Sequence, residues 1–339
     1  MIYHIVVEQF TRYYGTCLLA FCFIFFFFLF SGLYFICYAD SNEHDPFTSK
    51  TSQKFNFNFV TAGDFGCGDE PNKTINGMIK KNPGLVIALG DLSYNESAAC
   101  WINSISPLDN NDRVKIAFGE HDITRKMVRF NTYMNHFNLT KSYYSFNHQN
   151  VHFLAMATAK NAVIPYRNGS EQYNFIQEDL KNAHNNKSID WVIVYTFRPL
   201  YSSITEHYGD DVLPTTYHSL FDKYGVDVVL QAHNHNYQRT FPLRYNESSN
   251  TPQYNPIIAD KDKVEYKNPN GRLFLTVGTG GAEIYNFTAV SPYVVNQVAG
   301  HGFLNVDINT SSKESKLTGM FIENMDMNKK DQFSITKEK

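Results

Sequence analysis

Carboxylate and imidazole side chains recur at the ends of short apolar segments in this chain. They are Asp64 after Phe57–Val60, Asp91 after Leu85–Leu89, His121 and Asp122 after Val114–Phe118, and His233 and His235 after Val226–Leu230. Such segments are typical of buried strands, and open α/β sheets place their functional loops at the carboxyl ends of parallel strands. The side chains should therefore gather around one point. Carboxylates and imidazoles gathered in this way are metal ligands, so the pattern predicts a metal site.

Each motif has an ordinary explanation when taken alone, because Gly-Asp loops are common and a His-x-His pair can lie on a surface. Their order along the chain is more informative. Asp64, Asp91 with Tyr94, His121-Asp122, the segment Val194–Tyr201 and the pair His233 and His235 together resemble the calcineurin-like metallophosphoesterases. Tyr94 and the run His233–Arg239 are similar to the purple acid phosphatase branch of that family. The resemblance extends from Phe55 to about Ile322.

The resemblance implies a dinuclear metal centre, in which two ions clamp a phosphoryl group and generate a hydroxide nucleophile. Asp91 would bridge the two ions. The first ion, Fe(III), would bind Asp64, Asp91, Tyr94 and His235, since phenolate and carboxylate suit a hard ion. The second ion, Zn, Mn or Fe(II), would bind Asp91, His233 and two further ligands.

Further roles follow from the resemblance. His121, oriented by Asp122, would contact phosphate and protonate the leaving group. His207 would be a second such imidazole; the alternative is a solvated loop histidine. The loop Gly278-Thr279-Gly280-Gly281 would border the pocket, where its backbone could approach phosphate closely; the alternative is a simple tight turn.

Two positions depart from the family pattern. Glu120 stands where a metal-binding Asn is expected, and Phe197 stands where a His is expected. Because a phenyl ring cannot coordinate a metal ion, the second site loses a ligand, although Glu120 could compensate by binding bidentately or His207 by moving in. We therefore expect an intact first metal site and a weakened second one.

The N-terminal region has a different composition from the rest of the chain. Residues 13–39 carry no charge, and this length suffices for a helix to cross a bilayer. Arg12 precedes the segment, so the rest of the chain should lie outside the cytoplasm, as a membrane-anchored ectodomain or as a secreted protein cleaved after Ala39. A buried core helix is the alternative. In an oxidising compartment, Cys67 and Cys100 should form a disulfide; two unrelated thiols are the alternative.

The remaining sequence sets the architecture. Strands alternate with helices first and an all-strand run follows, which predicts an α/β domain with two sheets packed face to face; the resemblance implies a four-layer α/β/β/α sandwich. We expect an N-terminal anchor at residues 1–40 with one transmembrane helix, a linker at 41–54, the metallophosphoesterase domain at 55–325 and a tail at 326–339. The net charge of −3, without a basic cluster, argues against nucleic acid as a partner.

These features predict a metal-dependent hydrolase that faces the outside of the cell and acts on small phosphomonoesters. A catalytically impaired pseudophosphatase that serves as a surface binding module is the alternative, because of Phe197. A nucleotide or cyclic-nucleotide diesterase would use the same ligands.

Overall fold

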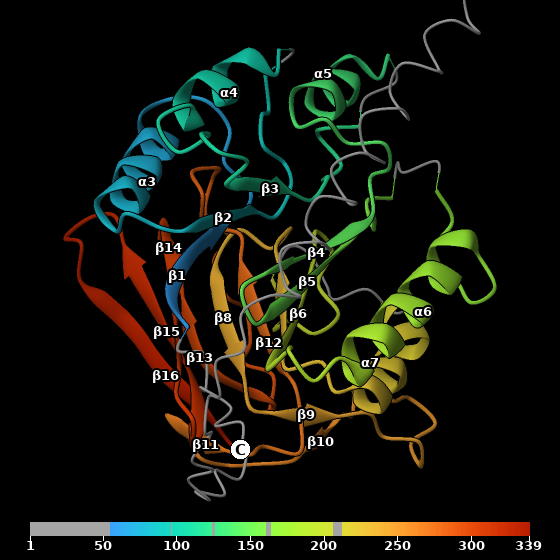
Figure 1. Cartoon of the computed structure of the whole chain (residues 1–339). Coiled ribbons are helices and arrows are strands. Elements are labelled where there is room, and N and C mark those ends of the chain that lie inside the picture. Colours follow the sequence, from blue (N-terminus) through green and yellow to red (C-terminus); the bar gives the residue numbers. More distant parts are fainter. Residues whose placement is uncertain (1–54, 96, 124–125, 161–163, 206–211) are drawn as a thin grey trace, which may run out of the picture. The chain divides into compact units, whose positions relative to one another are not determined.

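The protein forms a mixed α/β sandwich with two large sheets (Figure 1). The computed structural model describes residues 55–95, 97–123, 126–160, 164–205 and 212–339. The expected transmembrane segment at residues 13–39 and the linker at 41–54 lie outside these residues. Within the described ranges, no helix is both long and apolar enough to cross a membrane.

The first sheet has seven strands in the order β11-β16-β15-β14-β1-β2-β3. Its strands are β1 (Asn56–Ala62), β2 (Leu85–Ala88), β3 (Val114–Ile116), β11 (Glu265–Lys267), β14 (Gly302–Thr310), β15 (Glu314–Glu323) and β16 (Lys329–Glu338). β1, β2 and β3 run parallel, and β14, β15 and β16 form an antiparallel meander that joins β1. The helices α3 (Asp69–Lys80), α4 (Ala99–Ile105) and α5 (Val128–His136) follow the three parallel strands in turn.

The second sheet also has seven strands, in the order β13-β8-β12-β7-β6-β5-β4. Its strands are β4 (Tyr144–His148), β5 (Val151–Met156), β6 (Trp191–Thr196), β7 (Val228–Gln231), β8 (Tyr237–Thr240), β12 (Leu273–Val277) and β13 (Val294–Val298). Its central strands β5, β6, β7 and β12 are parallel. The other elements are α6 (Glu171–Asn185), the π-helix η1 (Pro214–His218), α7 (Ser219–Tyr224) and the short pair β9 (Leu243–Arg244) and β10 (Ile257–Ile258).

Two hydrophobic cores hold the sheets and helices together. In the larger core, Phe59 of β1 packs edge-on against Phe153 of β5, with ring centroids 5.5 Å apart. The smaller core contains Ile176 and Leu180 of α6 together with Val192 and Val194 of β6. The other residues of β6, such as Ile193, belong to the larger core on the opposite face of the sheet. Both faces of the second sheet are therefore buried, as its nearly continuous apolar strands require.

The expected C-terminal tail is wrong, because residues 329–338 form strand β16. This strand pairs antiparallel with β15 and parallel with β11. Only Phe333 and Ile335 bring large apolar side chains into its core face, and charged residues occupy most of the other positions, so the composition suggested a solvated segment. The antiparallel pairing with β15 is what makes it a strand.

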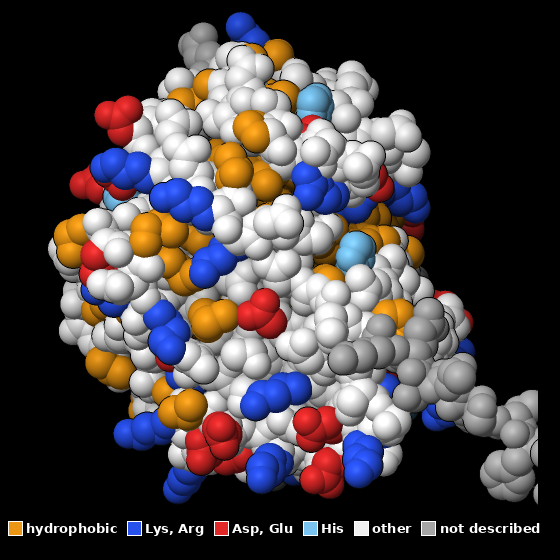
Figure 2. All heavy atoms as spheres, turned by 60° about the vertical axis from the view of Figure 1, so that its left-hand side comes forward, with side chains coloured by type: hydrophobic (Ala, Val, Ile, Leu, Met, Phe, Trp, Pro, Cys, Tyr) orange, Lys and Arg blue, Asp and Glu red, His pale blue; other side chains and the backbone are white. Residues whose placement is uncertain are grey.

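Figure 2 shows one face of the molecule, with the left-hand side of Figure 1 turned forward. Lys and Arg side chains alternate there with Asp and Glu, and hydrophobic side chains lie between them. This face therefore carries charges of both signs rather than the single positive field that attracts nucleic acid.

Candidate metal centre

The loops after β1 and β2 bring the first two predicted ligands together. The Asp64 amide donates to the Gly90 carbonyl, and the Phe65 amide donates to the Asp91 carbonyl, both at 3.0 Å. Asp64 and Asp91 have positive φ angles of 56° and 48°. Residues other than glycine rarely adopt this conformation, and such strain concentrates at functional sites.

Three predicted ligands converge on the phenol oxygen of the fourth, Tyr94. This oxygen lies 2.9 Å from His235 Nε2, 3.2 Å from Asp64 Oδ1 and 3.3 Å from Asp91 Oδ2. His235 Nε2 and Asp64 Oδ1 are 3.3 Å apart. Donors around a six-coordinate ion at about 2.1 Å lie about 3 Å from one another, so these spacings fit a single ion.

The phenol is an essential part of this donor set. Among the residues that the structure describes, no group of three or more His, Cys, Asp and Glu side chains is by itself arranged to hold a metal ion. With Tyr94, the set contains one imidazole, one phenol and two carboxylates. These are donors that suit a hard ion such as iron.

The electrostatics of the carboxylates also favour a cation. Burial and the neighbouring Asp64 carboxylate raise the pKa of Asp91 well above its usual value. Burial, with Asp64 and Asp91 beside it, raises the pKa of Tyr94. A bound cation would stabilise the charged forms of both groups, so the residues present fit a metal ion at this site.

Two residues that the sequence analysis did not identify orient His235. Its Nδ1 donates to the Glu283 carbonyl at 2.7 Å, which leaves Nε2 as the coordinating nitrogen. The ring of Tyr285 stacks on the imidazole with a centroid distance of 4.1 Å and an interplanar angle of 9°. Contacts of this kind fix the tautomer and orientation of a metal-binding histidine. Both residues lie about fifty positions from His235, and no local pattern in the sequence identifies them.

The residues predicted for the second ion have a different arrangement. The Phe197 ring is fully buried and lies edge-on against His233, with centroids 5.0 Å apart. Glu120 Oε1 accepts from the Lys160 amide at 3.2 Å and lies 3.7 Å from Nε of Arg198. The carboxylate expected to compensate for the missing histidine is thus paired with an arginine.

His121 is solvent-exposed, whereas its neighbour Asp122 is fully buried. The His121 ring lies 4.3 Å from that of Tyr94, and the His121 amide donates to Asp91 Oδ1 at 2.7 Å. Burial and the Arg129 charge lower its pKa.

Asp122 is fully buried, and burial raises its pKa to about 7. Its two carboxylate oxygens accept from the amides of Leu92 and Gly119 at 3.0 and 2.9 Å. These bonds join the loops after β2 and β3. They occupy the Asp122 carboxylate with backbone amides, and its expected role in orienting the His121 ring stays a prediction.

The glycine-rich loop at 278–281 packs against Asp64 and bonds to the neighbouring Gly63. The Gly280 amide donates to the Gly63 carbonyl at 2.8 Å, and the Thr279 hydroxyl donates to the Gly302 carbonyl at 2.8 Å. A Cβ atom on Gly278 would lie 2.6 Å from Asp64 Oδ2. Packing thus requires glycine at 278, and the loop supports Asp64. Its expected place at the border of the substrate pocket stays a prediction. His207, the other predicted substrate contact, lies outside the described residues.

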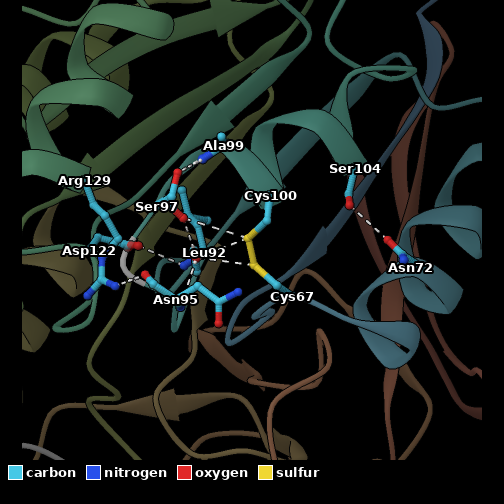
Figure 3. Close-up of a disulfide and its surroundings, with 11 residues drawn as sticks. Cys67, Asn72, Leu92, Asn95, Ser97, Ala99, Cys100, Ser104, Asp122 and Arg129 are labelled. Atoms are coloured by element: carbon cyan, nitrogen blue, oxygen red, sulfur yellow. Dashed lines mark hydrogen bonds between the residues drawn. A yellow bond between two sulfur atoms is a disulfide. The ribbon is translucent and has the colours of Figure 1, made fainter.

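A disulfide joins Cys67 to Cys100 across 33 positions of the chain, with Cα atoms 6.0 Å apart (Figure 3). It links the loop that carries Asp64 to the first turn of α4. The loop with Asp91 and Tyr94 leads directly into that turn.

Comparison with known proteins identifies the family. The model for calcineurin-like phosphoesterases matches residues 44–237. Purple acid phosphatase 21 of Arabidopsis thaliana is 28% identical over 265 residues, covering 72% of this chain and 54% of that protein. Probable inactive purple acid phosphatase 1 of the same plant is 29% identical over 181 residues, covering 51% and 27%.

A solved structure has a similar fold. A purple acid phosphatase from yellow lupin (Lupinus luteus) seeds matches with a TM-score of 0.68 and 21% identity, covering 84% of this chain and 54% of that one. The chain thus spans about half the length, or less, of these relatives. Because the family model matches more than half of its 339 residues, the chain belongs to the calcineurin-like phosphoesterases, and its relatives include purple acid phosphatases.

Proposed function

We propose that this protein is a metal-dependent phosphoric ester hydrolase that acts on phosphomonoesters through one firmly held metal ion. The observation that carries the proposal is the convergence of Asp64, Asp91 and His235 on the Tyr94 phenol oxygen, at 2.9–3.3 Å. The family membership of the chain supports the reaction class.

When bound, a metal ion at these donors would polarise a phosphoryl oxygen and lower the pKa of a water molecule. His121 is the proton donor for the leaving group, because its ring is exposed beside Tyr94. Because the pKa of His121 is lowered, its ring becomes protonated only in a more acidic solution than an ordinary histidine requires. Activity that depends on this proton should therefore increase toward acid pH until the substrate or the ligands become protonated.

The second metal site is weakened in this proposal. Support comes from the buried Phe197 ring against His233 and from the pairing of Glu120 with Arg198. The family's second ion, a divalent Zn, Mn or Fe, would have to bind with Asp91 and His233 and without the usual additional imidazole. We expect turnover below that of an enzyme with two complete sites.

The alternative is a pseudophosphatase that serves as a surface binding module. The Phe197 ring favours it, and one relative is named a probable inactive purple acid phosphatase. The deciding experiment is hydrolysis of p-nitrophenyl phosphate by the full chain with iron plus zinc or manganese, with Asp91→Ala as the background. Turnover that disappears with Asp91→Ala supports the hydrolase. Turnover equal to that of the variant across metals and pH supports the binding module. Bis-p-nitrophenyl phosphate in parallel separates a monoesterase from a diesterase.

We further propose that the catalytic domain faces an extracytoplasmic compartment, either anchored through residues 13–39 or secreted. The Cys67–Cys100 disulfide supports this location, because disulfides persist mainly in oxidising compartments. In intact cells, external protease should digest the catalytic domain of the anchored form. Complete protection, with none of the protein in the medium, would contradict the proposal.

A further inference from the structure

The disulfide lies beside the loop that presents Tyr94. Ser93, which immediately precedes Tyr94, is fully buried, and its hydroxyl oxygen lies 3.4 Å from both Cys67 Sγ and Cys100 Sγ. The same hydroxyl donates to the Ser97 carbonyl at 3.0 Å and accepts from the Asn95 amide at 3.2 Å. The atom that contacts the disulfide therefore also makes the hydrogen bonds to Asn95 and Ser97, which follow Tyr94 in the chain.

The loop that carries Cys67 also contacts Tyr94. Gly66 lies between Asp64 and Cys67 and has a φ angle of 79°. A Cβ atom on Gly66 would lie 3.4 Å from Cδ2 of the Tyr94 ring, so the ring rests on this part of the loop. Any movement of Cys67 away from Cys100 would shift the surface on which Tyr94 packs.

Noncovalent contacts hold the same loop on its opposite side (Figure 3). Asp122 accepts from the Leu92 amide, and Arg129 donates to the Asn95 carbonyl. The disulfide is the only covalent cross-link among the residues that the structure describes. Both cysteines are partly exposed, so a reductant can reach them.

We propose that the Cys67–Cys100 disulfide is a redox-sensitive positioning element of the metal centre, which holds the Tyr94 and Asp64 loops in register and strengthens metal binding. This inference rests on the metal-dependent function proposed above. Reduction breaks the S–S bond: a dithiol donates two electrons and two protons, becomes a disulfide itself and leaves two cysteine thiols. Without the cross-link, the Tyr94 oxygen and the Asp64 carboxylate lose their fixed separation, and the affinity for a metal ion falls.

The test measures the affinity of the full chain for Zn²⁺ by competition with a chromophoric chelator, before and after treatment with a phosphine that is then removed. Mass spectrometry establishes the thiol state of Cys67 and Cys100. Contacts that support metal ligands typically contribute 10–100-fold to affinity, so reduction should weaken Zn²⁺ binding at least tenfold. The Cys67→Ser/Cys100→Ser variant should bind as weakly without any reductant, and the phosphine should change it no further.

Two single variants separate positioning from general loosening. Ser93→Ala keeps the disulfide and removes the hydroxyl that contacts both sulfur atoms, together with that hydroxyl's bonds to Ser97 and Asn95. We expect several-fold weaker binding, and this variant keeps the test valid if the double variant does not fold. Ser104→Ala is the matched control, because Ser104 bonds α4 to α3, through Asn72 at 2.9 Å, rather than to the loop that carries Tyr94 (Figure 3). It should bind Zn²⁺ like the wild type.

The proposal is overturned if the cysteines are free thiols in the protein isolated under oxidising conditions, if that protein binds no Zn²⁺, or if full reduction changes the affinity less than twofold. Hydrolysis is assayed separately. Redox-dependent Zn²⁺ binding without turnover would contradict the proposed hydrolase and leave the positioning role standing. An unchanged Zn²⁺ affinity after reduction, together with normal turnover, would contradict the positioning role and leave the proposed hydrolase standing.

Discussion

Replacing Phe197 with histidine tests whether one side chain limits the second metal site. The Phe197 ring is fully buried, lies edge-on against the His233 ring at 5.0 Å, and would come within 2.8 Å of a Cβ atom on Gly90. An imidazole is slightly smaller than a phenyl ring, so Phe197→His should fit the same space. It would place a nitrogen donor beside His233.

We expect Phe197→His to lower the free energy of unfolding in the absence of metal and a second metal ion to raise it again. Without metal, the variant loses an edge-on aromatic contact that contributes about 0.5–1.5 kcal/mol. It also buries an imidazole nitrogen without a partner, which costs about 1–3 kcal/mol. Together these effects lower its free energy of unfolding by about 1.5–4.5 kcal/mol. A second ion at 100 times its dissociation constant would return about 2.7 kcal/mol.

The assay is chemical unfolding in chelator and in Zn²⁺, together with elemental analysis of the folded protein. Zn²⁺ should stabilise Phe197→His by about 2–3 kcal/mol more than it stabilises the wild type, and the metal content should rise from one ion per chain to two. Phe197→Leu is the control, since it removes the ring without adding a donor. Equal Zn²⁺ stabilisation of the two variants, or two ions already bound by the wild type, would refute the reasoning.

Three other substitutions test separate parts of the structure. The buried Arg239 donates to both carboxylate oxygens of Asp331, at 2.6 and 2.8 Å. Asp331→Asn removes this counter-charge, so the free energy of unfolding measured in urea should fall by about 3–5 kcal/mol. A decrease below about 1 kcal/mol would contradict this expectation. Burial lowers the pKa of His218 to about 3. Between pH 6.5 and 3 the unfolded chain therefore binds a proton on His218 that the folded chain does not. The free energy of unfolding should decrease by at most about 1.4 kcal/mol for each unit by which the pH is lowered in this range. His218→Gln should flatten that part of the stability curve measured by urea unfolding, and an unchanged slope would exclude His218 as its source. Gly278→Ala pushes against the Asn234 carbonyl, between His233 and His235, and against Asp64 Oδ2. Zn²⁺ titration should therefore show at least tenfold weaker binding, and wild-type affinity would contradict the buttress role.

The parts of the fold predicted from sequence are those with strong local signals. The apolar runs before Asp64 and Asp91 are β1 and β2, and the structure brings these two carboxylates together with Tyr94 and His235. β16 lacked such a signal, because Phe333 and Ile335 are the only large apolar residues in a strand of ten and the strand depends on pairing with β15.

The remaining site features depend on contacts between distant segments. The sequence does not show on which side of a loop a residue lies, so the bonds of the Asp122 carboxylate to the Leu92 and Gly119 amides were not predicted. Likewise, the Glu283 carbonyl that fixes His235 is a backbone group, and any residue type could supply it.

The organisation of the loops supports the proposal that the second metal site can vary while the first is kept. The ligand loops are held together by bonds that need no ion: the Asp64 amide bonds to the Gly90 carbonyl, Asp122 joins two loops through backbone amides, and Cys67 is bonded to Cys100. Because this framework lies outside the donor set, a substitution at Phe197 changes the coordination available beside His233 without removing any of these bonds. We therefore expect a substitution that fits the buried space of the Phe197 ring to alter the metal content of the site while the ligand loops stay in place.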